Sequence, residues 1–269
     1  VGIEIENIDA TILKYESITK DGLAPRIACE IIPVELETNK YALVIRVLPS
    51  WNPPHRVVYK GHDKFYARNS AGKYSLDVDE LRSLFTYSLL AEEKINNFIG
   101  ARITNIFINE LPFRLIDGPK MVLHVVPFDS FKSRMNHHIY DTPNLVARLR
   151  PMMHGGHDYR INLEGYFSYA SDADGNVGDY AQLFRNGIIE SVNWSSLVFQ
   201  EKYGTHGKKM IPGLAYEQRV IESLGGYLQL LRDVGVNLPV TISLAFVNCK
   251  GYTLGTKSLD ESYPCDRDI

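Results

Sequence analysis

The chain has 269 residues, with 29 basic against 32 acidic side chains, which gives a formal net charge of −3. Hydrophobic residues make up 45% and charged residues 23%, a composition that excludes disordered and fibrous proteins. At about 150 residues per domain, this length predicts one large or two ordinary domains. The net charge excludes a global basic field, so any binding of nucleic acid must be local.

The sequence also indicates where the protein works. The longest apolar runs, Tyr41–Val47 and Val122–Phe128, fall far short of the roughly 18 residues that a membrane span needs, so no membrane partner is expected. The N-terminus has neither an initiator Met nor a secretory layout, and we expect the chain to begin inside a longer protein. Three widely separated cysteines without Cys-x-x-Cys spacing favour a reducing cytoplasm over a disulfide framework or a zinc site.

The first predicted elements are a helix and a β-hairpin. Asn7 or Asp9 can cap a helix that ends near Gly22, where glycine and a following proline form a stop signal. Ile27–Leu36 and Tyr41–Leu48 are rich in Ile and Val and are joined by four polar residues. They predict two antiparallel strands.

A second hairpin is predicted after a proline-containing loop. The loop, Ser50–His55, cannot be helical because two prolines lack amide donors. Arg56–Tyr59 and Lys64–Arg68 then predict two strands around Gly61-His62-Asp63, which gives a sheet of about four strands. The alternating positions expected in this hairpin are Val57, Tyr59, Phe65 and Ala67.

A long helix should follow. Ser75 or Asp77 can cap it, and Glu80 stands three residues after Asp77 as in a capping box. An apolar stripe continues from Val78 to Ile103, and a break is expected near Ser88.

The second half of the chain again mixes strands and a helix. Met121–Phe128, Ile161–Ala170, Asp179–Val192 and Val240–Cys249 predict strands, and Tyr216–Val234 predicts a helix. The segment 141–156 is polar, carries Pro and Gly, and is expected to be a loop.

One concentrated basic patch stands out between residues 56 and 73. It holds five cations against the single acid Asp63, with aromatic residues interleaved; the cations are Arg56, Lys60, Lys64, Arg68 and Lys73. Phosphate backbones attract such cations, and aromatic faces stack on unpaired bases, so the pattern favours nucleic-acid contact. The alternative is a solvated hairpin whose aromatic side chains fill the core. Trp51, in the loop before it, should either pin that loop to the sheet or offer a stacking face.

The motifs at residues 50–55, 65–74 and 79–82 together resemble the C-terminal part of the Schlafen AlbA-like domain of bacterial proteins. In that family a proline-bearing segment precedes a strand of the form aromatic-x-Arg-x-Gly/Asn-Ser, and a helix with Glu-(Leu/Ile)-Arg follows. Arg68 and Ser70 match the Arg and Ser of this pattern. The resemblance covers about residues 1–90 and implies an α+β domain that binds nucleic acid, DNA or RNA, in bacterial defence or regulation.

The resemblance leaves two alternatives open. Some eukaryotic relatives cut transfer or ribosomal RNA, so the protein could be a metal-dependent ribonuclease that uses Mg or Mn. The carboxylate motif of that family, with a second Glu five residues after the first, is not identifiable here, and the acids would lie upstream of this chain. The other alternative is an ATP-binding regulatory protein, because members of the family often carry that label.

Other candidate sites are better explained as ordinary structure. His137-His138 and His154–His157 lack a third ligand at a fixed offset and favour surface loops over a metal site. Asp172–Asn176 lacks the twelfth-position Glu of a calcium loop and predicts a hairpin turn. Gly204–Lys209 does not have the spacing of a phosphate-binding loop, and Ser195 has no nucleophile elbow around it.

The sequence therefore predicts an α+β protein of two lobes, with mixed sheets and flanking helices. Residues 1–110 would be a Schlafen AlbA-like domain without its N-terminal part, and 111–269 an appended α+β lobe. The protein is expected to bind nucleic acid in the cytoplasm, with no cofactor assigned and a homo-oligomer left open. The residues expected to contact nucleic acid are Arg56, Lys60, Lys64, Arg68, Ser70 and Lys73, with Trp51 as the stacking candidate.

Overall fold

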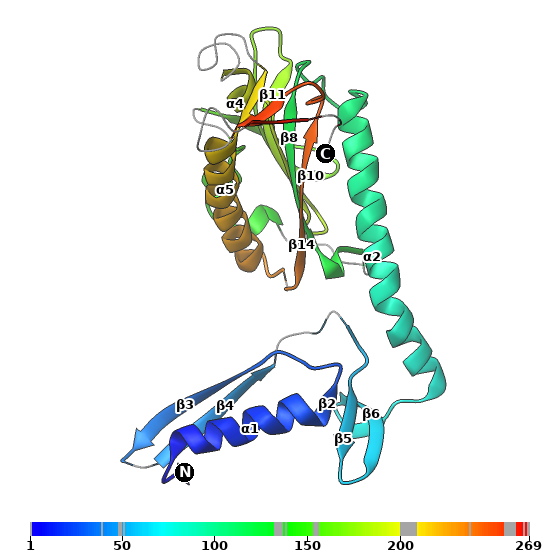
Figure 1. The fold of residues 1–269 in the computed structure, drawn as a ribbon, viewed down its shortest axis with the longest axis vertical. Helices are drawn as coiled ribbons and strands as arrows, with labels where there is room; N and C mark the ends of the chain where they lie inside the picture. Colours follow the sequence, from blue (N-terminus) through cyan, green and yellow to red (C-terminus); the bar gives the residue numbers. More distant parts are fainter. Residues whose placement is uncertain are drawn as a thin grey trace. The chain divides into compact units, whose positions relative to one another are not determined.

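A computed structural model describes residues 2–38, 40–47, 50, 52–131, 137, 139–152, 156–199, 209–236, 238–255, 262–265 and 267. The chain is α+β, with several antiparallel sheets and flanking helices, as the sequence predicts. It divides into two compact units, residues 1–92 and 93–269, and each is described by itself (Figure 1). The predicted assignment of the two lobes to residues 1–110 and 111–269 stays a prediction.

The first unit begins with the predicted helix and hairpin, and both are confirmed. Helix α1 (Ile8–Gly22) is capped by the Oδ1 atom of Asn7, which accepts a hydrogen bond from the Ala10 amide at 2.9 Å. The antiparallel pair is β3 (Cys29–Glu37) and β4 (Lys40–Val47), and β1 (Ile3–Glu4) completes a sheet of order β1-β4-β3.

A separate sheet of order β2-β5-β6-β7 contains the second hairpin. Its strands are β2 (Leu23–Ala24), β5 (Arg56–Tyr59), β6 (His62–Asn69) and β7 (Gly72–Ser75). The prediction of one sheet of about four strands that unites both hairpins is therefore wrong. The turn also differs, because it consists of Lys60 and Gly61, both with positive φ (47° and 74°), and Asp63 is a strand residue opposite Val58.

Helix α2 (Val78–Phe107) begins at the predicted capping box. The Glu80 amide donates to Asp77 Oδ1 at 2.8 Å, and the Asp77 amide donates to Glu80 Oε2 at 3.0 Å. The helix runs through Ser88 without interruption, so the predicted break is wrong. The segment contains no proline, and one serine does not end a helix of 30 residues.

The second unit is built on a six-stranded antiparallel sheet of order β14-β8-β12-β11-β10-β9. Its strands are β8 (Lys120–Pro127), β9 (Asp158–Ile161), β10 (Gly165–Ser171), β11 (Val177–Phe184), β12 (Ile189–Asn193) and β14 (Val240–Val247). Helix α5 (Gly213–Asp233) packs on one face, where Tyr227 and Leu230 join the core side chains Leu123 and Val125. The part of α2 in this unit packs on the other face, where Ile106 lies in the same core cluster as Val122.

Three predicted elements of this unit are confirmed. Strand β8 matches the strand predicted at 121–128, strand β14 the one at 240–249, and helix α5 the helix at 216–234. The predicted strands Ile161–Ala170 and Asp179–Val192 are each wrong in one respect, because each contains a turn. The first turn lies between Ile161 and Gly165, and the second includes Gly187 with φ 84°. Both turns contain Asn and Gly, in Asn162–Gly165 and in Asn186-Gly187, so the sequence holds turn signals that the prediction overlooked.

Shorter elements complete the second unit. The predicted loop at 141–156 is only partly irregular, since it contains the end of η2 and the short helix α3. The remaining elements are η1 (Phe128–Phe131), η2 (Ile139–Asp141), α3 (Leu145–Arg148), α4 (Ser195–Phe199), β13 (Met210–Pro212), β15 (Thr253–Gly255) and β16 (Ser262–Pro264).

Candidate nucleic-acid interface

The register of β5, β6 and β7 decides which side chains share a face of the sheet. Val57 lies opposite Lys64, and Arg68 lies opposite Lys73. Side chains alternate along a strand, so residues two apart share a face and directly opposed residues do as well. One face therefore carries three cations and two tyrosines, and we call it the basic face: Tyr59, Lys64, Tyr66, Arg68 and Lys73.

Cations and aromatic rings lie close together on the basic face. The Lys73 ammonium is 4.5 Å from the centroid of the Tyr66 ring, and the Lys60 ammonium of the turn is 5.3 Å from that of Tyr59. Tyr59 is 62% exposed and Tyr66 is half-buried. The exposed Tyr59 ring therefore has one ammonium group, that of Lys60, beside it.

The positive charge of the basic face is not balanced locally. Among the residues that the structure describes, no carboxylate lies within ion-pair distance of Lys60, Lys64, Arg68 or Lys73. All four side chains are exposed. Their charges are therefore available to an anionic partner.

Arg56 is placed differently from the other predicted contacts. It lies opposite Phe65 and so on the other face of the sheet, where its Nε atom is 3.0 Å from Asp63 Oδ1. The Phe65 ring on that face packs edge-to-face against Phe85 of α2, with 5.7 Å between ring centroids. The structure does not bring Arg56 together with the cations of the basic face, and its charge is balanced by Asp63.

The other two predicted residues are Ser70, which lies in a turn at the end of this sheet, and Trp51, which lies outside the described residues. Ser70 is exposed in the two-residue turn between β6 and β7, directly beyond the Asn69–Gly72 pair. Its hydroxyl is therefore placed at the tip of the same hairpin. Trp51 lies outside the described residues, so the choice between a pinned and a stacking indole stays a prediction.

The other candidate sites from the sequence are the histidine pairs, the segment 204–209 and the turn at Asp172, and the structure describes only part of them. The described residues contain no group of three His, Cys, Asp or Glu side chains that could hold a metal ion. His138, His154 and most of the segment 204–209 lie outside them. Asp172 forms the predicted hairpin turn, because its Oδ1 atom accepts hydrogen bonds from the Asp174 and Asn176 amides, and its bonds to Asn176 lower the pKa of its carboxyl.

Ser195 lies at the start of α4 (Ser195–Phe199). Its amide lies 3.2 Å from Asp179 Oδ1, which also accepts from the Trp194 amide at 2.9 Å, so Asp179 caps the start of α4. Burial raises the pKa of Asp179, and the hydrogen bonds from Ser195 and its neighbours oppose that change.

A fully buried polar cluster in the second unit was missed by the sequence reasoning. Glu190 accepts two hydrogen bonds from Arg102, at 2.6 and 2.8 Å, one from Tyr180 at 2.7 Å, and lies 2.9 Å from His124 Nε2. Burial alone would raise the pKa of Glu190, but the interactions with Arg102 and His124 outweigh it and lower the pKa to about 2. The only signal in the sequence was the isolated polar residues inside apolar strands. The cluster ties α2 to the sheet and is not part of the basic face.

No helix in the described part of the chain is long and apolar enough to cross a membrane. Comparison of the chain with known protein families, with curated proteins and with solved structures found no match. The function is therefore argued from the geometry of the candidate interface.

Proposed function

We propose that the chain binds nucleic acid through the basic face of β5, β6 and β7. The observation that carries this proposal is that Lys64, Arg68 and Lys73 share one face of a sheet with Tyr59 and Tyr66, without a carboxylate partner among the described residues. Cations that are free of acidic partners gain affinity from phosphates by releasing condensed counterions. In a chain of net charge −3, this binding depends on the local cluster.

The arrangement suits a single strand better than a duplex. A duplex hides the faces of its bases, whereas a single strand can place a base on an exposed aromatic ring. Tyr59 offers such a ring beside the Lys60 ammonium, and a sheet face with aromatic rings is a common platform for single-stranded RNA. Single-stranded RNA or DNA is therefore the proposed ligand.

Replacing Tyr59 by alanine tests the stacking part of the proposal. Loss of one stacked base is expected to weaken single-strand binding by about 5- to 100-fold, since such stacking contributes roughly 1–3 kcal/mol. Fluorescence anisotropy with a labelled single-stranded RNA, the matching DNA and the duplex measures the effect. Duplex affinity is expected to change little, and the melting temperature should be nearly unaffected because the ring is largely exposed.

Tyr74→Ala is the matched control. Tyr74 belongs to the other face of the sheet, opposite Ala67, and its hydroxyl bonds to Glu80 at 3.0 Å. This variant should bind single strands like the unmodified chain. Equal losses in both tyrosine variants, or no binding by the unmodified chain, would argue against the basic face. Added Mg²⁺ in a parallel reaction distinguishes the ribonuclease alternative, because only cleavage shortens the labelled RNA.

A further inference from the structure

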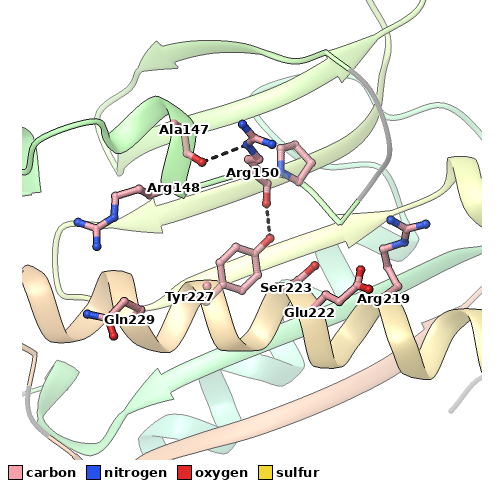
Figure 2. A pocket seen from close by; sticks show the side chains of 10 residues that line it. Ala147, Arg148, Arg150, Arg219, Glu222, Ser223, Tyr227 and Gln229 are labelled. Carbon is pink, nitrogen blue, oxygen red and sulfur yellow. Dashed lines mark hydrogen bonds between the residues drawn. The ribbon is translucent and has the colours of Figure 1, made fainter.

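A second cluster of cations lines a hollow in the second unit, and its residues belong to none of the sites described above. The hollow has a volume of about 460 Å³ and lies between α5 and the segment that contains α3 and the residues after it (Figure 2). Its lining includes Arg148 and Arg150 from that segment and Arg219, Ser223 and Gly226 from α5. The volume falls within the range of small-molecule sites, about 300–1,000 Å³.

The charges around the hollow are unequal. Arg148 is paired with Asp233, whereas neither Arg150 nor Arg219 forms an ion pair within the part of the chain that the structure describes. The one acid among the described lining residues is Glu222, whose carboxylate accepts a hydrogen bond from Gln218 at 2.8 Å. The lining residues therefore carry an excess of positive charge.

The segment that carries Arg150 is fixed to α5. The main-chain oxygen of Arg150 accepts a hydrogen bond from the hydroxyl of the buried Tyr227 (Figure 2). The Arg150 Nε atom donates to the main-chain oxygen of Ala147 at 3.1 Å. Arg148 and Arg219 lie toward opposite ends of the hollow, with Tyr227 between them (Figure 2). In the view of Figure 2, the Arg150 guanidinium lies on the side of its segment away from α5, whereas the Arg219 side chain extends from α5 itself.

Two consecutive glycines in α5, Gly225 and Gly226, give an independent indication that the hollow takes a ligand. Glycine inside a helix lowers its stability relative to alanine. A Cβ atom at Gly225 or Gly226 would meet no heavy atom within 4 Å, so packing within the protein does not require either glycine. Gly226 lines the hollow, where its missing side chain leaves the surface of α5 open to an occupant.

We propose that this hollow binds a small molecule that carries a phosphate monoester, with the phosphate held by Arg219. Guanidinium groups match phosphate oxygens in charge and in bidentate geometry, which favours a phosphate over other small anions. The remaining volume admits a body of nucleotide or sugar size, for which Ser223 and Gln229 offer polar groups. This site is independent of the basic face and of the function proposed for it.

Calorimetric titration of the whole chain with inorganic phosphate, ribose 5-phosphate and adenosine monophosphate tests the proposal. At least one of the two monoesters is expected to bind, and Arg219→Gln should weaken that binding at least tenfold, because hydrogen bonds to charged groups are strong. Arg114→Gln, an exposed arginine outside the lining, should bind like the unmodified chain. Absence of monoester binding, or equal losses in both arginine variants, would overturn the proposal.

Two glycine-to-alanine variants of α5 distinguish an effect on ligand binding from an effect on stability. Gly226→Ala is expected to raise the melting temperature by about 2 °C through helix propensity, yet to weaken monoester binding at least tenfold because its methyl group enters the hollow. Gly225→Ala should raise the melting temperature equally and leave binding unchanged, since Gly225 is not part of the lining. Unchanged binding in Gly226→Ala would contradict the site. Displacement of the monoester by single-stranded RNA would assign the hollow to nucleic acid instead and also overturn the proposal.

Discussion

Glu190→Ala is expected to lower the free energy of unfolding by about 3–5 kcal/mol. The Glu190 side chain is fully buried, and its two carboxylate oxygens form hydrogen bonds with Arg102, His124 and Tyr180. Removing the carboxylate leaves the Arg102 guanidinium, only 10% exposed, without its bidentate partner in a low-dielectric site. Urea denaturation of the whole chain, followed by circular dichroism, measures the loss.

Glu164→Ala provides the comparison for this prediction. The Glu164 carboxylate is also near Arg102, at 3.7 Å, but its side chain is 39% exposed. An exposed ion pair contributes about 1 kcal/mol or less, so this variant should lose little stability. Similar losses in the two variants would mean that the buried cluster does not stabilise the unit as described.

The same cluster sets a pH dependence. The folded protein lowers the pKa of Glu190 from its usual 4.5 to about 2, so the carboxylate form stabilises the fold by about 3 kcal/mol above pH 4.5. This stabilisation is lost as the pH falls from 4.5 toward 2, because the unfolded chain then takes up a proton that the folded chain resists. Glu190→Gln should show a flatter dependence of the unfolding free energy over that range.

Replacing Lys64, Arg68 and Lys73 together by glutamate is expected to weaken binding to single-stranded RNA at least 100-fold at about 0.1 M salt. Three attractive phosphate contacts become repulsive, and each phosphate contact contributes to affinity through counterion release. All three side chains are exposed, so circular dichroism should show an unchanged fold. Anisotropy titrations measure the affinity.

Arg56→Gln is the control for this triple variant. Arg56 is part of the same basic stretch of sequence, but it lies on the opposite face and pairs with Asp63. Its loss is expected to change the affinity by less than about threefold, as for an exposed group outside the contact. A loss as large as that of the triple variant would show that the face assignment is incorrect.

The elements that were predicted correctly have local causes. Asn7 caps α1 with its own side chain, and Asp77 and Glu80 cap α2 reciprocally, so residues three apart contain the signal. The hairpin turn was misplaced because Lys60 adopts a positive φ, which is uncommon for a residue with a long side chain. Moving the turn changes which side chains of β5 and β6 share a face, so Phe65 lies opposite Arg56 and not on the face of Val57.

The candidate sites could be predicted only where local sequence determines them. A cluster of cations within 18 residues is visible in the sequence, but the division into a basic face and the Arg56–Asp63 pair depends on register. Glu190 and Arg102 are 88 residues apart and meet only because α2 packs on the sheet. The hollow likewise combines Arg150 with Arg219 through tertiary packing, which no local spacing in the sequence encodes.

The salt dependence of binding to single-stranded RNA tests the central claim most directly. The logarithm of the association constant should fall linearly with the logarithm of the salt concentration, with a slope of about −0.7 for each phosphate neutralised on a single strand. If Lys64, Arg68 and Lys73 each contact a phosphate, the slope of the triple glutamate variant should be shallower by about 2 than that of the unmodified chain. Equal slopes for the two proteins would contradict the claim that the basic face binds nucleic acid.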